Sequence, residues 1–364
     1  MENTASQTER TISEIRSQID KNPVRREVRR DKRPRPTGRN LVQEFATRAR
    51  RNWVREMLDW ARCKNIVLPT VKELERGIAA LDCSKPYQDE GDDECPIFLL
   101  ATGWRSGSTL LQRILSTDPN VLLWGEPLGE MALLPGLTSM LAGVSEFPEL
   151  RERCSPDNPA FASLATSWIA SLYPPGGDFR EGLRALITSW MGNAARQRGF
   201  TRWGFKEVRL GAADAVLLHW LYPKAKFILL TRNPYDCYLS LSDSGWHNVY
   251  HRRPEIRIDS AAGLARHWNC LAVSWSELPP EFPAIRIKYE DMVAGKVDFQ
   301  MLGSWLGINI REESALSLYI GQTARRRRLG WCQRLIVAQE TRGGMHSLGY
   351  SGNGVASKQE ETAA

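Results

Sequence analysis

A short turn at residues 103–109 concentrates groups that bind anions. The apolar run Cys95–Thr102 before it has the length and composition of a strand buried on both faces of a parallel sheet. The turn reads Gly-Trp-Arg-Ser-Gly-Ser-Thr, and residues 110–115 continue as a helix. The backbone N–H groups of such a turn and the N-terminus of the helix point at one spot and attract negative charge. We therefore expect the turn to hold phosphate.

The side chains of the turn strengthen this expectation. Gly103 and Gly107 allow close approach of a ligand to the backbone, and Arg105 supplies a fixed cation. The hydroxyl donors are Ser106, Ser108 and Thr109. The turn is not a GxxxxGK[ST] loop, because three residues separate its glycines and no lysine follows Gly107. The alternative is an ordinary glycine turn between a strand and a helix.

Two later segments extend the pattern. Residues 226–231 form a second apolar strand, Arg232 then begins an Arg-Asn pair, and Ser240 follows eight positions after Arg232. The segment 287–292 reads Ile-Lys-Tyr-Glu-Asp-Met. Together with the turn at 103–109, these segments resemble the sulfotransferases that use 3′-phosphoadenosine 5′-phosphosulfate (PAPS), which have a basic-Ser-Gly-hydroxyl loop, an Arg-Asn segment with a later Ser, and an RYEDL stretch.

The resemblance covers about residues 95–307 and implies a P-loop NTPase-like α/β fold. It implies that residues 105–109 surround the 5′-phosphosulfate, that Arg232 and Ser240 hold the 3′-phosphate, and that no metal is needed. It also implies that a late basic loop closes over the 3′-phosphate, which here is the Arg325–Arg328 cluster with Arg326 and Arg327 at its centre. A solvated charged turn is the alternative for that cluster. For Arg232 and Ser240 the alternatives are a surface ion pair and a solvated hydroxyl.

Sulfuryl transfer by in-line displacement needs a base for the acceptor proton and cations for the leaving phosphate. Glu126 lies in a Gly-Glu-Pro sequence that resembles the general-base Gly-Glu of tyrosylprotein and some bacterial sulfotransferases. Lys206 matches a lysine that ends a core strand in the family and would meet the sulfuryl group, while Arg105 would pair with the 5′-phosphate. The alternatives are a helix-start carboxylate for Glu126 and an ion pair with Glu207 or Asp214 for Lys206.

Strands and helices alternate along the chain, which predicts a central parallel sheet flanked by helices, with ligands beyond the carboxyl ends of the strands. Besides those at 95–102 and 226–231, the predicted strands are residues 121–124, 203–208 and 284–289. The predicted helices include residues 211–222, 234–242, 261–277 and 335–349, and one or two more within 41–81. Residues 128–197 have helical patterning without family motifs, and we expect them to build the acceptor side.

Charge and composition divide the chain into four parts. Nine basic and two acidic residues lie between Lys21 and Arg39, so this segment alone carries the formal net charge of +7. We predict a flexible basic arm over 1–40, a helical extension over 41–90, a sulfotransferase domain over 91–350 and a polar tail over 351–364. Because the rest of the chain has no net charge, we expect no nucleic-acid partner and consider an acidic partner for residues 21–39.

The composition, 42% hydrophobic and 25% charged, is that of a globular protein. No apolar run approaches the roughly 18 residues of a transmembrane helix and no signal peptide begins the chain, so we expect a cytoplasmic protein without a membrane span. The seven cysteines show no CxxC pair or zinc-binding spacing and are expected to be reduced thiols.

The leading hypothesis is a PAPS-dependent sulfotransferase that acts on a hydroxyl or amine and releases adenosine 3′,5′-bisphosphate. Two other classes stay open: a P-loop-type nucleotide kinase or NTPase, and a polyanion-binding protein acting through residues 21–39. The acceptor is expected to be a small molecule, a carbohydrate or a natural product, and His247 and His251 are candidates for its pocket.

Overall fold

The computed structural model describes residues 53–62, 66–81, 94–144, 163, 165–166, 176–244, 260–311 and 329–350. These residues belong to one compact unit that begins at Trp53. Several predictions lie outside the described residues, namely the basic arm, the polar tail, the Arg325–Arg328 cluster with Arg326 and Arg327, and the two histidines His247 and His251.

The unit is built on a five-stranded sheet in which every paired strand is parallel, in the order β2-β3-β1-β4-β5. The strands are β1 Ile97–Ala101, β2 Val121–Trp124, β3 Arg202–Glu207, β4 Lys226–Thr231 and β5 Ala284–Lys288. Every residue of β1 is fully buried, because helices cover both faces of the sheet at its centre. The predicted parallel sheet flanked by helices is thus confirmed.

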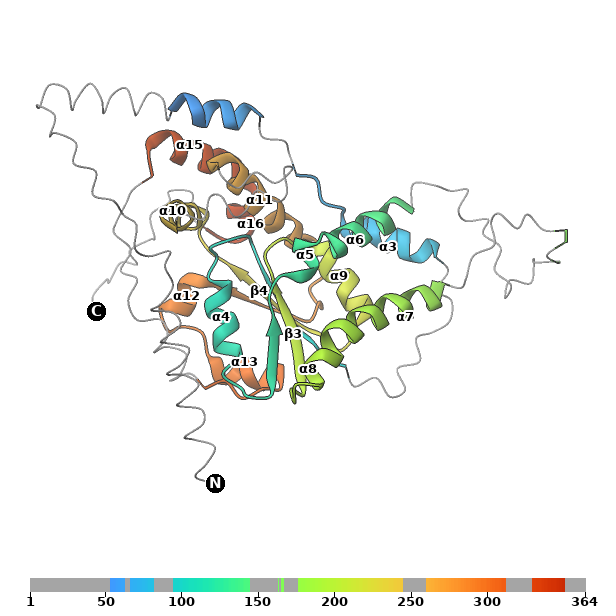
Figure 1. Cartoon of the computed structure of the whole chain (residues 1–364). Helices are drawn as coiled ribbons and strands as arrows, with labels where there is room; N and C mark the ends of the chain where they lie inside the picture. The colour runs from blue at the N-terminus through green and yellow to red at the C-terminus, as the bar shows by residue number, and fades with distance from the viewer. Residues whose placement is uncertain are drawn as a thin grey trace, which may run out of the picture. The chain divides into compact units, whose positions relative to one another are not determined.

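Successive residues of β1 face two separate hydrophobic cores: Ile97 and Leu99 pack into one, and Phe98 and Leu100 into the other. Figure 1 shows α4, α12 and α13 on the left of the sheet and α7, α8 and α9 on its right. The first core takes side chains from α4 Ser108–Leu115, α10 Pro234–Ser244, α11 Ala261–Ser274, α12 Tyr289–Val293, α13 Phe299–Leu306, α15 Trp331–Glu340 and α16 Arg342–Ser347. The second takes them from α3 Val71–Ala80, α5 Pro127–Glu130, α6 Leu133–Val144, α7 Gly176–Ile187, the π-helix η4 Thr188–Asn193, α8 Ala194–Arg196 and α9 Ala212–Leu221.

Two helices lie within the described part of the region 41–81, where one or two were predicted. The first spans residues 53–62, and its Glu56 Oε1 accepts hydrogen bonds from Tyr238 Oη of α10 (3.3 Å) and Gln333 Nε2 of α15 (3.1 Å). The second is α3, which starts at a capping box formed by Thr70 and Glu73 and buries Leu74 completely. Both helices therefore pack into the hydrophobic cores on the faces of the sheet.

The prediction of one closing helix over 335–349 is wrong. Helix α15 begins earlier, at Trp331, and ends at Glu340, after which Thr341 leaves the helical region (φ −104°, ψ 4°). The separate helix α16 then packs on α11, where the backbone N–H of Gly344 donates to Asn269 Oδ1 at 2.7 Å. The pair Gly343-Gly344 lies directly after the break, and a Cβ atom on Gly344 would lie 2.7 Å from Ala272 Cβ of α11, so this glycine permits the close docking. Helix α11 also ends sooner than predicted and continues as the 3₁₀ turn Trp275–Glu277.

The chain order of the strands creates a switch point beside β1. Strand β3 pairs with one edge of β1, and the next strand, β4, pairs with the other edge. Loops that leave the carboxyl ends of neighbouring strands on opposite sides of such a point leave room for a ligand between them. No helix in the described ranges is both long enough and apolar enough to cross a membrane.

Candidate active site

The turn after β1 has an unusual backbone conformation. Three of its residues have positive φ angles, namely Gly103 (110°), Arg105 (64°) and Gly107 (89°). A positive φ is strained for Arg105, and backbone strain of this kind gathers at ligand sites. Gly107 is the N-cap residue of α4, so the free N–H groups of the first helical turn follow directly. The predicted strand, turn and helix are thus present, while anion binding by the turn stays a prediction.

The hydroxyl groups of this turn differ in their surroundings. Ser106 is fully buried, and its Oγ donates to the carbonyl oxygen of Gly103 at 2.8 Å, so this hydroxyl closes the turn on itself. Ser108 is buried in the first turn of α4, whereas Thr109 is exposed. Their contacts with a ligand stay predictions.

The structure brings the Arg232 segment to the turn. Arg232 follows β4, the neighbour of β1, and its Nη1 donates to the carbonyl oxygen of Arg105 at 2.8 Å. Arg105 Nε in turn donates to Ser240 Oγ on α10 at 3.1 Å. Within the described residues Arg232 makes no ion pair, which disfavours the surface-pair alternative, and its Nε is buried without a hydrogen-bond partner. Three predicted binding residues from two distant segments therefore meet.

The segment after β5 packs against Arg232 and Asn233. The guanidinium carbon of Arg232 lies 4.2 Å from the centre of the Tyr289 ring. Glu290 Oε1 accepts a hydrogen bond from the backbone N–H of Asn233 at 2.8 Å, and Glu290 Oε2 accepts another from Tyr350 Oη at 3.0 Å. Tyr289 was assigned no role from the sequence, although its place at the end of the predicted strand 284–289 and within the segment 287–292 was a usable signal.

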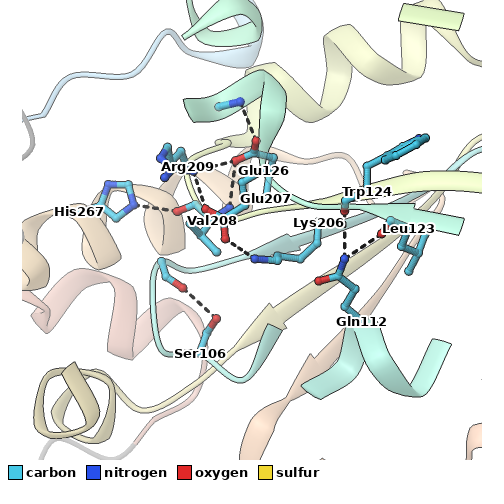
Figure 2. A network of polar contacts seen from close by, with 12 residues as sticks. Ser106, Gln112, Leu123, Trp124, Glu126, Lys206, Glu207, Val208, Arg209 and His267 are labelled. Atoms are coloured by element: carbon cyan, nitrogen blue, oxygen red, sulfur yellow. Dashed lines mark hydrogen bonds and ion pairs between the residues drawn. The ribbon is translucent and has the colours of Figure 1, made fainter. Parts of the chain in front are cut away.

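A second polar cluster lies at the ends of β2 and β3. Lys206 Nζ of β3 forms an ion pair with Glu126 Oε1. Arg209 Nη1 lies 2.7 Å from Glu126 Oε2 and 3.3 Å from Glu207 Oε2. Figure 2 shows these four side chains converging on one another.

The contacts in this cluster bear on the alternatives for both residues: Lys206 is in an ion pair and Glu126 lies at a helix start, as those alternatives describe. Lys206 pairs with Glu126, not with Glu207 or Asp214. Glu126 occupies the N-cap position of α5, but its side chain makes no capping hydrogen bond. The two predicted catalytic residues thus contact each other. Arg209, which completes the group, was not singled out from the sequence, although it directly follows the predicted strand 203–208 that contains Lys206.

Burial dominates the ionisation of Glu207. Its side chain is 0% exposed, and burial raises its pKa to about 7, to which the charge of Glu126 contributes. Arg209 and the backbone N–H of Gly129, which donates to Glu207 Oε1 at 2.7 Å, act in the opposite direction. The ion pair with Arg209 is therefore weaker than the cost of removing the carboxylate from water.

Trp104 connects the turn with the second cluster. The guanidinium carbon of Arg209 lies 4.9 Å from the centre of the Trp104 ring. The Trp104 ring also lies beside the His267 ring, at 4.7 Å between ring centres. His267 Nε2 forms a hydrogen bond of 2.8 Å with the carbonyl oxygen of Val208, between Glu207 and Arg209 (Figure 2). The turn and the carboxylate cluster therefore belong to one site.

The backbone that carries Glu126 is held on several sides. Gln112 Nε2 of α4 donates to the carbonyl oxygens of Leu123 (2.9 Å) and Trp124 (3.1 Å), as Figure 2 shows. The backbone N–H of Lys206 donates to the carbonyl oxygen of Gly125 at 3.2 Å. Within the described residues, no group of three or more His, Cys, Asp or Glu side chains is arranged to hold a metal ion.

The protein is an α/β fold, and its two polar clusters lie near the switch point of the sheet beside β1. Residues 96–312 match the model of the sulfotransferase family, and the chain therefore belongs to this family. No curated protein matches the chain.

Similar solved structures include three sulfotransferases. The sulfotransferase domain from the curacin biosynthetic pathway has 18% identity and a TM-score of 0.40, covering 71% of this chain and 98% of that one. The domain from the Synechococcus PCC 7002 olefin synthase has 18% identity and a TM-score of 0.38, covering 73% and 99%. The sulfotransferase from Alicyclobacillus acidocaldarius has 16% identity and a TM-score of 0.37, covering 70% and 94%.

Proposed function

We propose that this sulfotransferase moves a sulfuryl group from PAPS to a hydroxyl or amine acceptor and releases adenosine 3′,5′-bisphosphate. The observation that carries the proposal is the contact chain from Arg232 through the Arg105 carbonyl and the Arg105 side chain to Ser240. It joins the segment that resembles a 3′-phosphate site to the turn that resembles a 5′-phosphosulfate loop, as one ligand with phosphates at both ends requires.

The residues present fit such a ligand. Arg232 Nε and Thr102 Oγ1 are buried at the ends of the two central strands without hydrogen-bond partners within the described residues. Unpaired buried polar groups are costly, so a bound anion that accepts from them is favoured. When bound, PAPS supplies an activated sulfuryl group. The residues of the chain then orient its phosphates and the acceptor.

Glu126 is proposed as the general base and Lys206 as the cation beside the sulfuryl group. Glu126 takes the proton of the acceptor while the bond from acceptor oxygen to sulfur forms and the bond from sulfur to the phosphate oxygen breaks. Lys206 and Arg105 neutralise the negative charge that this leaves on the phosphate. Because an ammonium group has three donors, Lys206 can keep its contact with Glu126 and still reach a sulfuryl oxygen.

The first test is ligand-induced stabilisation. Adenosine 3′,5′-bisphosphate at about a hundred times its dissociation constant adds roughly 2.7 kcal/mol and raises the unfolding midpoint by a few degrees. We expect Ser240→Ala to reduce this shift. The matched control is Ser242→Ala on the same helix, because Ser242 Oγ donates to the carbonyl oxygen of Tyr238 at 2.9 Å. Stabilisation by ATP with Mg²⁺ alone would contradict the proposal and favour a kinase or NTPase.

The second test concerns the base. We expect Glu126→Gln to bind adenosine 3′,5′-bisphosphate as the wild type does and to lose turnover of PAPS with phenol, alcohol and sugar acceptors. Glu181→Gln, an exposed change on α7, is the control. Unchanged turnover in Glu126→Gln would remove Glu126 from the mechanism. A small-molecule, carbohydrate or natural-product acceptor, an acidic partner for residues 21–39 and a cytoplasmic location stay predictions.

A further inference from the structure

Arg209 has no role in the mechanism above, yet it contacts both carboxylates of the second cluster. We infer that Arg209 is a positioning residue, which holds Glu126 Oε2 and couples the base to the anion-binding turn through Trp104. The inference rests on the proposed function of Glu126. It assigns the two oxygens of Glu126 to different cations, since Lys206 contacts Oε1 and Arg209 contacts Oε2.

The surroundings of Arg209 fix its guanidinium group in place. One face lies over the Trp104 ring at 4.9 Å, and Nη1 is shared between Glu126 at 2.7 Å and Glu207 at 3.3 Å. Only 11% of the Arg209 side chain is exposed. A planar, stacked guanidinium loses little further freedom when it forms a hydrogen bond, so it orients a carboxylate better than a flexible ammonium does.

Glu207 connects Arg209 to helix α5, whose N-cap residue is Glu126. Its Oε1 accepts from the backbone N–H of Gly129 on α5, and a Cβ atom on Gly129 would lie only 2.2 Å from Glu207 Oε2. The carboxylate therefore fills the space beneath α5, which only a glycine at 129 leaves open. Arg209 is thus tied to β3, to α5 and to the anion-binding turn.

The two cations around Glu126 have different tasks. Lys206 is shared with the sulfuryl group in the proposed mechanism, so its contact with Glu126 weakens as it approaches the phosphosulfate. Arg209 contacts none of the predicted phosphate-binding side chains in the described residues, and its bond to Oε2 persists. Glu126 Oε1 then becomes the oxygen that receives the proton from the acceptor.

The experiment compares Arg209→Gln and Arg209→Lys in the full chain, with PAPS and water as the acceptor. We expect Arg209→Gln to lower kcat about a hundredfold, as misplacement of a catalytic group by about 1 Å does. The KM for PAPS and the dissociation constant of adenosine 3′,5′-bisphosphate should change less than threefold. Arg209→Lys, which keeps the charge, should recover about tenfold of the loss. The control is Arg113→Gln, an exposed arginine on α4.

Combination with Glu126→Gln separates positioning from a general structural role. If Arg209 acts through Glu126, Arg209→Gln costs less than about threefold in kcat once Glu126 is already Gln, because residues that act as a unit are not additive. A full further loss in that background, or wild-type kcat in Arg209→Gln alone, would overturn the inference. So would weakened bisphosphate binding equal to the loss in kcat.

A measurement without ligand tests the role of Arg209 independently of the proposed function. In thermal unfolding without any nucleotide, the midpoint shifts of Glu126→Gln and Arg209→Gln should be less than additive in the double variant, since the two side chains share one contact. Additive shifts would overturn the inference even if sulfuryl transfer is observed. A wild type that neither binds adenosine 3′,5′-bisphosphate nor turns over PAPS would instead refute the proposed function.

Discussion

Replacement of Glu207 by Gln tests whether burial or the neighbouring arginine controls this carboxyl group. Glu207 is fully buried at the end of β3, within 3.3 Å of Arg209 Nη1. Burial nevertheless raises its pKa from 4.5 to about 7. Gln has nearly the same shape, its oxygen can accept the hydrogen bond from Gly129, and it carries no charge at any pH. Its NH2 group replaces Oε2, which accepts from the Val208 N–H and from Arg209, so the variant loses these bonds at a cost that does not depend on the ionisation of residue 207.

The raised pKa predicts a specific dependence of stability on pH. Between pH 4.5 and about 7 the folded protein holds a proton on Glu207 that the unfolded chain has released, so the free energy of unfolding falls as the pH rises through this window. The size of the loss is roughly 3 kcal/mol, at about 1.4 kcal/mol for each pH unit. The Gln variant does not lose this stability. The difference in free energy of unfolding between the variant and the wild type should therefore increase by the same amount as the pH rises from 4.5 to about 7.

Urea unfolding at a series of pH values from 4.5 to 8 measures this difference. We expect the free energy of unfolding of Glu207→Gln to rise relative to the wild type by roughly 3 kcal/mol across the series. The exposed control Glu181→Gln should run parallel to the wild type. A constant difference, or a wild type that gains stability over the variant at high pH, would show that the Arg209 ion pair outweighs burial and would refute the reasoning.

Two further predictions follow from the same structure. Gly107 has a φ of 89°, and a Cβ atom added to it would lie 2.2 Å from Tyr289 Cδ2. We therefore expect Gly107→Ala to abolish stabilisation by adenosine 3′,5′-bisphosphate in thermal unfolding. The control Gly136→Ala, which has open space around it, should keep this stabilisation. Burial raises the pKa of Asp214 from 3.8 to about 6, so the free energy of unfolding of the wild type should fall as the pH rises between these values. Asp214→Asn should remove this fall, which lies roughly one pH unit below that of Glu207, and urea unfolding extended to lower pH measures it.

The sequence predicted those features whose causes are local. The predicted bounds of the strands at 121–124 and 226–231 agree with those in the structure. The residues that end such an apolar run lie next to it in the sequence, so its bounds can be read locally. The turn at 103–109 was found for the same reason, since its glycines and its position between strand and helix are properties of neighbouring residues. The closing helix at 335–349 was misjudged: its interruption at Thr341 is followed by the Gly343-Gly344 pair, a local signal that the prediction did not use, and α16 docks onto α11, which only the structure shows.

The tertiary structure decided which of these groups meet. Glu126 and Lys206 are 80 residues apart in the chain, and Arg105 and Ser240 are 135 apart. The types of these residues and the predicted elements that carry them were evident from the sequence, but the contacts between their side chains were not. Strand order β2-β3-β1-β4-β5 places β1 between β3 and β4, and this order alone brings Trp104, Arg209 and Arg232 around one turn. Side-chain contacts depend on which strands pair, and pairing is set by burial of the whole sheet.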